Sequence, residues 1–201
     1  MLHNKHQEFF DLLAAEWDLM FTAEDLERLA RIVERLHIER GMDIVDLGCG
    51  TGVLFDMLRR RVGPEGSVTG VDFSLQMAVR AHRNFPFSNI NVIDADAIEL
   101  PFADSCFDMG VAFAAFPHFS NQQQAIAEIH RVLKGGAKFY ILHLSSSGEV
   151  ADIHNRIGGV VKHDEIPPEE KLRIMFDSSR FSHLSVQDHP GLYLASAVNA
   201  E

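Results

Sequence analysis

Apolar residues follow two patterns that alternate along the chain. Short runs rich in β-branched and other apolar residues are separated by segments whose apolar residues recur every three or four positions, the spacing of one helical face. Strands that alternate with helices in this way predict a parallel sheet covered by helices on both faces. The expected strands lie at 43–47, 67–71, 90–94, 107–113 and 137–144, and the expected helices between them at 53–62, 75–85 and 122–133.

Two further helices are expected before the first strand. Phe9, Phe10 and Trp17 fall on one face of a helix predicted over residues 3–20. A second apolar helical face follows, with Thr22 as its N-cap. The simpler interpretation is that both helices cover one side of the sheet. The alternative is that the first helix closes over a bound ligand as a lid, with its aromatic residues excluding water.

The C-terminal part has a different pattern. A helix is expected at 169–177, because proline is tolerated in the first turn of a helix and two prolines precede this segment. Alternating apolar runs at 181–188 and 192–198 flank the turn His189-Pro190-Gly191 and predict a hairpin. We assign no helix or strand to residues 145–166.

The turn after the first strand carries the clearest chemical signal. Residues 43–52 read DIVDLGCGTG, an apolar strand followed by glycines at alternate positions. Such glycines allow positive φ and let a ligand approach the backbone. The sequence does not match the dinucleotide-binding fingerprint G-x-G-x-x-G, because Val53 stands in place of its third glycine. In addition, the charge of Asp46 would repel the pyrophosphate of a dinucleotide but would suit a cationic ligand. The alternative is a glycine turn that only joins strand to helix.

The amino-acid composition limits the kinds of protein that this chain can be. The 201 residues are 46% hydrophobic and 23% charged, which fits one globular domain. The net charge of -11 argues against a nucleic-acid partner. The first residues carry charges throughout and no apolar run is long enough to span a bilayer, so we expect a cytoplasmic protein. Cys49 and Cys106 are too far apart in sequence for a redox or zinc pair motif. We expect Cys49 to be a turn residue and Cys106 to be a buried strand residue.

The glycine turn, VDLGCGTG, resembles motif I of the class I S-adenosylmethionine-dependent methyltransferases. Residues 72–77 look like the second motif of that family, and 128–142 resemble its R-V-L-K-P-G-G block. Residues 94–108 are similar to the signature G-D-A-x-x-L-P-F…F-D of the ubiquinone/menaquinone-biosynthesis-like branch, methyltransferase type 11. The resemblance covers about half of the chain. It implies an α/β fold, a Rossmann-like three-layer sandwich with a mostly parallel seven-stranded sheet, an antiparallel last strand and two extra N-terminal helices.

The resemblance also divides the chain. We expect one methyltransferase domain over residues 1–201, with a helical cap at 1–40, a cofactor-binding core at 43–145, and an acceptor-side segment with the C-terminal hairpin at 146–201.

S-adenosylmethionine is the cofactor that the resemblance implies. In the family the acid corresponding to Asp46 lies near the amino-acid end of the cofactor, and the glycine turn contacts its methionine and ribose parts. Asp72 is expected to accept hydrogen bonds from the ribose hydroxyls, with helix capping as the alternative role. The residue before Asp96 is alanine where the signature has glycine, so either Asp94 or Asp96 faces the adenine. The expected cofactor-binding residues are Asp46, Gly48, Cys49, Gly50, Gly52, Asp72, Phe73, Met77, Asp96, Ala97, Ala112 and Phe113.

Histidines supply the candidate catalytic groups. The family segment after the fourth strand typically ends in two histidines, of which only His118 is present here. A methyl transfer to an acceptor that must lose a proton needs a base, and His118 and His143 are the candidates, because imidazole titrates near neutrality. His143, His154, His163 and Asp164 are ligand types that suit zinc or iron, but their spacing matches no standard pattern, so we expect no metal.

The sequence therefore predicts methyl transfer by in-line displacement to a small, apolar or aromatic acceptor, with neither a nucleic acid nor a membrane span involved. A non-catalytic S-adenosylmethionine-binding module is the main alternative. A nucleotide-dependent dehydrogenase and an enzyme that transfers another group from a related cofactor are further ones. The accepting atom and the oligomeric state are left unassigned.

Overall fold

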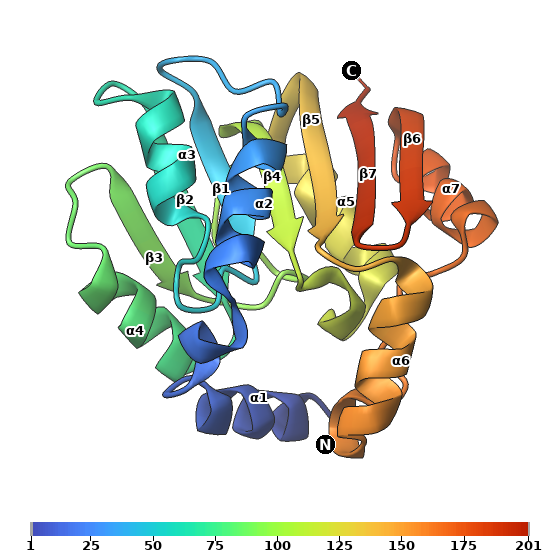
Figure 1. Cartoon of the computed structure of the whole chain (residues 1–201). Coiled ribbons are helices and arrows are strands. Elements are labelled where there is room, and N and C mark those ends of the chain that lie inside the picture. Colours follow the sequence, from blue (N-terminus) through green and yellow to red (C-terminus); the bar gives the residue numbers. More distant parts are fainter. Residues whose placement is uncertain (1, 201) are drawn as a thin grey trace.

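A twisted sheet forms the centre of the molecule (Figure 1). The computed structural model describes residues 2–200, and the side chains from Lys5 onward. Among these residues seven strands pair in the order β3-β2-β1-β4-β5-β7-β6. The strands are β1 (Asp43–Leu47), β2 (Ser67–Asp72), β3 (Ile90–Asp94), β4 (Phe107–Phe113), β5 (Leu133–His143), β6 (Phe181–His189) and β7 (Leu192–Asn199).

One strand runs against the others. The pairs from β3 to β5 are parallel, whereas β7 is antiparallel to both β5 and β6. β6 and β7 form the predicted hairpin, with Asp188 opposite Tyr193 close to its turn. The expected Rossmann-like fold, with a mostly parallel sheet and an antiparallel last strand, is confirmed.

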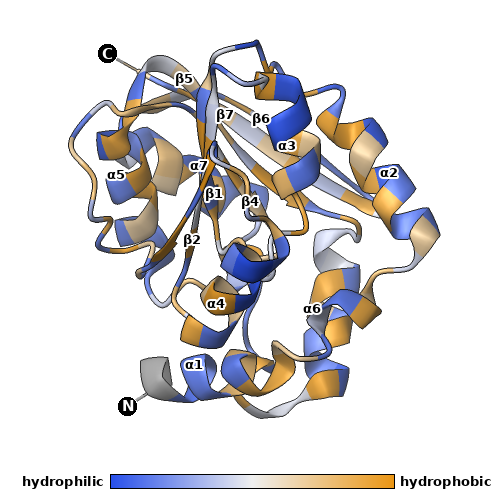
Figure 2. Cartoon of the chain, turned by 90° about the vertical axis from the view of Figure 1, so that its left-hand side faces the viewer, coloured by the Kyte–Doolittle hydropathy of each residue, from blue (hydrophilic) through white to orange (hydrophobic). Residues whose placement is uncertain are grey.

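Helices cover both faces of the sheet (Figures 1 and 2). α2 (Ala23–Val33) and α3 (Phe55–Val62) lie on one face, with α4 (Leu75–Asn84) beside β2 and β3. α5 (Gln122–Val132) and α7 (Glu169–Ser178) lie on the other. The remaining helices are α1 (Leu2–Leu13), α6 (Ser147–Ile157) and the short 3₁₀ turns η1 (Trp17–Met20), η2 (Phe116–His118) and η3 (Gly159–Val161).

Alternation along the strands builds the two halves of the core. In β1, Ile44 packs among the residues of α2 and α3, whereas Val45 and Leu47 join the cluster beneath α5 and α7. All three side chains are fully buried, as expected of a central parallel strand whose two faces are both covered. Figure 2 shows the apolar sides of the helices turned toward the strands. No helix in the described part of the chain is long and apolar enough to cross a membrane.

The two predicted N-terminal helices are present, but the first is interrupted. α1 ends at Leu13, and η1 starts at Trp17 after a turn. The apolar spacing continues through the break, so local sequence does not explain it. Tertiary contacts do: the Trp17 ring packs beside the Phe10 ring, with centroids 5.9 Å apart, and the Thr51 hydroxyl donates to Asp18. For α2, the predicted N-cap is confirmed, because Thr22 and Asp25 form a reciprocal capping box.

Two local expectations were wrong. Helix α6 occupies part of the stretch to which no element was assigned, and it begins with a capping box between Ser146 and Glu149. Cys106 is not a buried strand residue, since it is partly exposed and precedes the first residue of β4. Its thiol donates to the carbonyl of Ala103, 2.9 Å away, which belongs to the turn before the strand.

Candidate functional site

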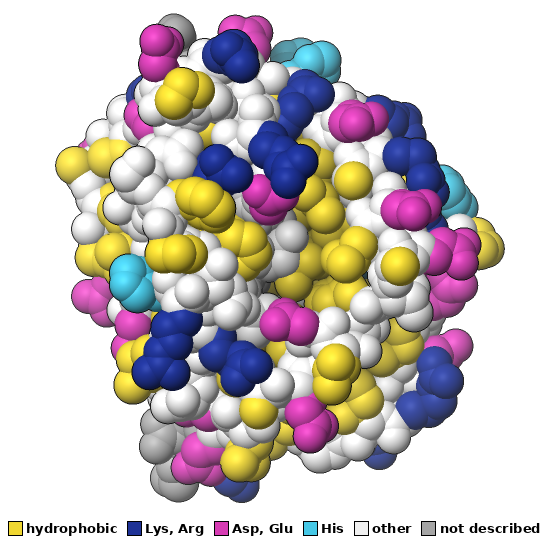
Figure 3. Space-filling view, turned by 60° about the vertical axis from the view of Figure 1, so that its left-hand side comes forward, with side chains coloured by type: hydrophobic (Ala, Val, Ile, Leu, Met, Phe, Trp, Pro, Cys, Tyr) yellow, Lys and Arg dark blue, Asp and Glu magenta, His cyan; other side chains and the backbone are white. Residues whose placement is uncertain are grey.

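The glycine turn lies where the sheet reverses its strand order. β1 pairs with both β2 and β4, so the chain winds away from β1 in both directions. In open α/β sheets this switch point leaves a crevice at the carboxyl ends of the strands, where ligands bind. A cavity of about 800 Å³, including its open mouth, lies at this place and we call it the glycine-turn cavity. Figure 3 shows apolar side chains gathered around a hollow on this side of the molecule.

Two glycines leave room for the cavity. Gly48 and Gly50 have φ of 70° and 54°, a region that side chains rarely adopt. A Cβ on Gly48 would lie 2.4 Å from the Cβ of Ala115, and one on Gly50 would lie 3.1 Å from Nε1 of Trp17. Both glycines line the cavity, so backbone forms its floor there.

Asp72 fastens the turn to the end of β2. Its carboxylate accepts hydrogen bonds from the N–H groups of Gly50, at 2.7 Å, and Ser74, at 2.9 Å. Burial raises the pKa of Asp72 to about 6, although the two N–H groups pull it down. Asp72 also lines the cavity, so the same side chain shapes the turn and can accept from a ligand.

Asp46 presents a second carboxylate to the same cavity. Its side chain is buried, and within residues 2–200 its Oδ1 has no hydrogen-bond partner. Burial, and then the neighbouring charge of Asp72, raise the pKa of Asp46 to about 8. An unpartnered buried carboxylate is costly, and a cationic ligand group placed beside it would offset that cost.

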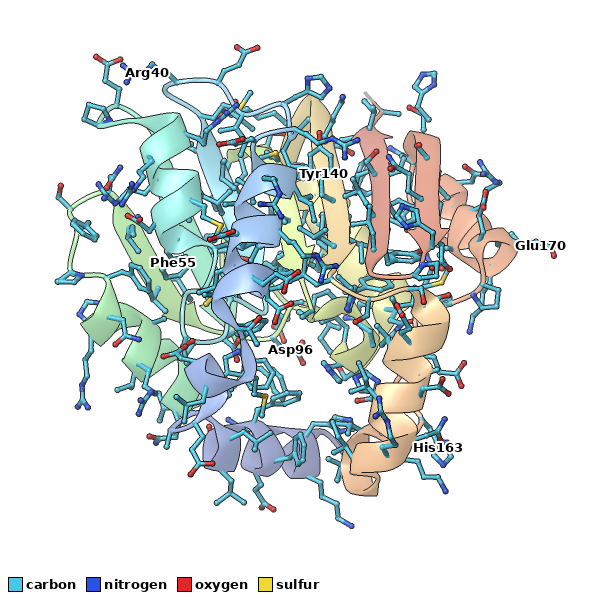
Figure 4. The ribbon with its side chains drawn as sticks, in the orientation of Figure 1. Arg40, Phe55, Asp96, Tyr140, His163 and Glu170 are labelled. Atoms are coloured by element: carbon cyan, nitrogen blue, oxygen red, sulfur yellow. The ribbon has the colours of Figure 1, made fainter. Side chains whose placement is uncertain are left out.

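The far end of the cavity is formed by the second and third strand ends. Phe73 and Met77 follow β2, and the loop with Ala95, Asp96 and Ala97 follows β3. Of the two acids left open by the sequence, Asp96 lines the cavity and Asp94 does not. In Figure 4, Asp96 lies between the strand ends and α1.

The N-terminal segment closes the cavity on one side. Phe10, Trp17 and Phe21 line it, and Asp11 ties α1 to α4 by accepting from the Ser74 hydroxyl at 2.6 Å. α1 lies at the strand ends and packs against α4 and η3, so it does not cover a side of the sheet as the simpler interpretation expected, whereas α2 does. Phe9, expected beside these residues, instead lines a neighbouring cavity.

This neighbouring space, which we call the histidine cavity, has about 1060 Å³ including its open mouth. Its wall is mostly apolar and aromatic, with Asp25, Ser145 and a group of three histidines, His118, His143 and His154, as its polar residues. It shares Phe113 and His118 with the glycine-turn cavity, among other residues. Two ligands could therefore meet at this shared wall. Among residues 2–200, no group of three or more His, Cys, Asp or Glu side chains is placed to hold a metal ion.

Comparison with known proteins gives the family. The model of a family described as a methyltransferase domain matches residues 45–141. The chain is 34% identical over 148 residues to a 2-phytyl-1,4-naphtoquinone methyltransferase of Nostoc, covering 69% of this chain and 64% of that protein. It is also 34% identical over 116 residues to a demethylmenaquinone methyltransferase of Staphylococcus aureus, covering 57% and 48%.

Solved structures agree in fold. A chain in the complex between the Haloferax volcanii Trm112 methyltransferase activator and a methyltransferase superposes with a TM-score of 0.81 at 21% identity, covering 96% of this chain and 98% of that one. A SAM-dependent methyltransferase from Aquifex aeolicus gives a TM-score of 0.66 at 18% identity, covering 88% and 97%. Residues 45–141 belong to the methyltransferase domain family. The Aquifex aeolicus protein is named for its dependence on SAM, which is S-adenosylmethionine.

Membership of this methyltransferase family leaves the activity to be argued from the site. The chain spans between about half and two thirds of the length of the curated relatives it matches. The similar structures also include one of the [4+2]-cyclase SpnF, at 21% identity with a TM-score of 0.67. The shared fold therefore does not by itself define the reaction.

Most residues expected to bind the methyltransferase cofactor meet at one cavity. Gly52 and Ala112 do not line it: a Cβ on Gly52 would meet the rings of Phe55 and Phe85, and Ala112 is buried in the core. The absence of a side chain at Gly52 thus leaves room for these two rings. The residues that do line the cavity are Asp46, Gly48, Cys49, Gly50, Asp72, Phe73, Met77, Asp96, Ala97 and Phe113.

Both candidate bases line the histidine cavity, and only one of them also reaches the glycine-turn cavity. His118 lines both cavities, whereas His143 lines the histidine cavity. Sequence reasoning missed Phe21, Ala114 and Ala115 as cavity residues. The position of the two alanines directly after β4, at the strand-order switch, was a usable signal for them. No spacing pattern marked Phe21.

Proposed function

We propose that the chain transfers a methyl group from S-adenosylmethionine, held in the glycine-turn cavity, to a small apolar or aromatic acceptor in the histidine cavity. The observation that carries this proposal is the shared wall of the two cavities, which includes Phe113 and His118. A donor and an acceptor held side by side can react in line without meeting in solution, and such positioning can lower a barrier by ~7–11 kcal/mol.

The residues of the glycine-turn cavity fit the donor. Asp46, whose Oδ1 has no hydrogen-bond partner among the described residues, is assigned to a cationic group, such as the ammonium of the methionine part. Asp72, at the end of β2, is placed to accept from the ribose hydroxyls. Asp96 and the Ala97 N–H are assigned to the adenine edge, with Phe73 and Met77 packing on the adenosine. When bound, S-adenosylmethionine supplies an activated methyl group on its sulfonium.

The chain itself then has to exclude water and align the acceptor. Phe10, Trp17 and Phe21 separate the reacting region from solvent, since they line both cavities. The two named relatives are methyltransferases of naphthoquinone and menaquinone type, which supports an aromatic acceptor here too. Exposed Met20 and Ile157 lie at the histidine cavity, so we assign the entry of the acceptor to the gap between η1 and α6.

Methyl release tests the proposal. The purified chain should bind S-adenosylmethionine and form S-adenosylhomocysteine when apolar ring compounds are supplied, and formation should stop when the acceptor is omitted. Tight cofactor binding with no product from a broad panel of phenols, amines, thiols and ring compounds would instead indicate a non-catalytic binding module.

A further inference from the structure

A carboxylate and three histidines from distant segments meet at the end of the histidine cavity. Oδ2 of Asp164 lies 2.7 Å from Nδ1 of His118 and 2.9 Å from Nε2 of His6. The backbone oxygen of Asp164 lies 2.5 Å from Nδ1 of His154. The Asp164 side chain is only 14% exposed, so this arrangement is nearly enclosed.

This arrangement fixes the orientation of His118. Because Asp164 accepts, Nδ1 of His118 carries the proton, and Nε2 is left with the lone pair that can take a proton from a ligand. Burial lowers the pKa of His118, with the hydrogen bond and charge of Asp164 offsetting this in part. His118 is therefore neutral at pH 7. Burial likewise opposes ionisation of Asp164, but His118 and His6 hold the pKa of Asp164 below its ordinary value.

His143 differs from His118 in having no carboxylate beside it. Its side chain is 5% exposed, and within the described chain its Nε2 has no hydrogen-bond partner. Burial lowers the pKa of His143 to about 3, with smaller contributions from His118 and His154. It is thus a poor base. Because His143 lines the cavity, its unpartnered nitrogen can instead hydrogen-bond a polar group on the ligand.

The aromatic part of the histidine cavity wall favours a flat apolar ligand. Phe21 and Phe113 lie with ring centroids 5.7 Å apart and tilted by 38°, and Phe10 packs its edge against Phe9 and against His118. Aromatic walls of this kind favour an aromatic ligand. A charged ligand would lose its hydration here without a full set of new partners.

We propose that the acceptor is an aromatic ring compound bearing a hydroxyl group, that His118 oriented by Asp164 removes the hydroxyl proton, and that His143 hydrogen-bonds a second polar group on the ring. This rests on the methyl transfer proposed above. His118 Nε2 takes the proton, and the acceptor oxygen, or the ring carbon to which its charge spreads, forms the new bond to the methyl carbon. The electron pair of the broken C–S bond stays on sulfur. In the C-methyl case the methylated ring carbon then loses its proton to solvent and the ring oxygen regains one from solvent, which restores the aromatic hydroxyl compound. In either case His118 passes its proton to solvent, so one proton is released per methyl group transferred.

Matched naphthalene compounds test the acceptor class with the full-length chain. 1-Naphthol and 1,4-dihydroxynaphthalene, the latter kept reduced during the assay, should give S-adenosylhomocysteine, whereas 1-methoxynaphthalene should not. Mass spectrometry and NMR of the product then distinguish an O-methyl from a C-methyl group, and either supports the proposal. Turnover of 1-naphthylamine or naphthalene-1-thiol without turnover of any hydroxyl compound would overturn it while leaving methyl transfer intact. Cofactor binding without turnover of the hydroxyl compounds would overturn it too, and failure of cofactor binding would remove the proposed function itself.

Variants test the roles of the two residues. His118→Gln should lower kcat with 1-naphthol about 100-fold at pH 7, the usual contribution of a general base. The loss should shrink as the pH approaches about 10, where a phenol ionises unaided. Asp164→Asn should lower kcat roughly 10-fold and, in NMR titration, lower the pKa of His118. A loss that stays constant with pH would indicate a merely structural role and overturn the assignment of His118.

A control and a binding measurement complete the test. His163 is exposed and points away from the cavity in Figure 4, so His163→Gln should change neither kcat nor its pH profile. In calorimetry with S-adenosylhomocysteine present, His143→Leu should weaken binding of reduced 1,4-dihydroxynaphthalene about 10-fold and that of 1-naphthol far less. Equal effects on both compounds would contradict the role of His143.

Discussion

The carboxylate of Asp72 accepts from the N–H of Gly50 at 2.7 Å, across 22 positions of sequence. This hydrogen bond joins the end of β2 to the glycine turn after β1, so two parts of the proposed cofactor site are held in a fixed relation before any ligand binds. Asp46, 1% exposed, lies beside them.

The buried carboxyl of Asp46 should make the cofactor-free chain less stable as the pH rises. An aspartate in an unfolded chain titrates near 3.9, whereas the pKa of Asp46 in the folded chain is about 8. The folded state therefore binds a proton more tightly between these values, and this contribution to stability is lost from about pH 4 to about pH 8. Asp46→Asn should gain stability relative to the wild type between pH 5 and pH 8, as measured by urea unfolding. An identical difference at both pH values would contradict the raised pKa.

The same group should make cofactor binding depend on pH. If the Asp46 carboxylate binds the ammonium of S-adenosylmethionine, the proton that it carries at neutral pH must leave on binding. Affinity should then rise between pH 6.5 and pH 8.5, with proton release seen as a buffer-dependent heat in calorimetry. Asp46→Asn should flatten this profile. A wild-type affinity that does not change over this range would argue against an ammonium partner for Asp46.

Gly48 should be intolerant of a side chain for reasons of space as well as backbone conformation. Gly136 is its control, because it also has positive φ, 80° against 70°, but a Cβ there meets nothing within 4 Å. Gly136→Ala should cost about 1–2 kcal/mol of stability and leave cofactor affinity unchanged. Gly48→Ala should cost more and weaken cofactor binding at least 10-fold. Ala115→Gly, added to Gly48→Ala, should restore part of both losses in unfolding and binding measurements, because it removes the 2.4 Å contact. Failure of this rescue would show that the contact does not limit Gly48.

Trp17 should report on both cavities. It is the single tryptophan of the chain and lines each of them. S-adenosylmethionine should therefore change the fluorescence of the wild type in a saturable way, with a midpoint equal to the dissociation constant from calorimetry. Trp17→Phe should abolish the signal and keep binding within a few-fold. A bound cofactor that leaves the fluorescence unchanged would place it away from Trp17.

The sequence predicted each strand of the sheet, although β5 begins at Leu133, four residues before its predicted start, and takes in the last residue of the predicted helix 122–133. β3 and β4 begin and end where the apolar runs predicted, because buried parallel strands must be apolar on both faces. The acids at the ends of β1 and β2 and the glycine turn also meet as expected, since strand ends of a parallel sheet converge at one edge. What the sequence could not give was the break after Leu13, which depends on the packing of Trp17 on Phe10 and on the hydrogen bond from Thr51 of the glycine turn to Asp18.

Polar contacts between residues far apart in the chain could not be predicted from the sequence either. His6 and Asp164 lie 158 positions apart, and no local spacing predicts their pairing. Helix α6 was missed for a different reason. The serine and glycine at its start resemble a loop, and one buried position of the helix is the polar His154. The capping box Ser146-x-x-Glu149 was a readable signal for its beginning.

Calorimetry of S-adenosylmethionine binding to two aspartate variants tests the central claim most directly. Asp72→Asn keeps an oxygen that can accept from the Gly50 N–H but removes the negative charge proposed to bind the ribose. Asp94→Asn is the control, because it makes the same change at the exposed end of β3, outside the cavity. One cofactor should bind per wild-type chain. Asp72→Asn should weaken binding by about 10-fold or more, the scale of one hydrogen bond to a charged group, while Asp94→Asn binds like the wild type. Unchanged affinity in Asp72→Asn, or no binding to the wild type, would contradict the account.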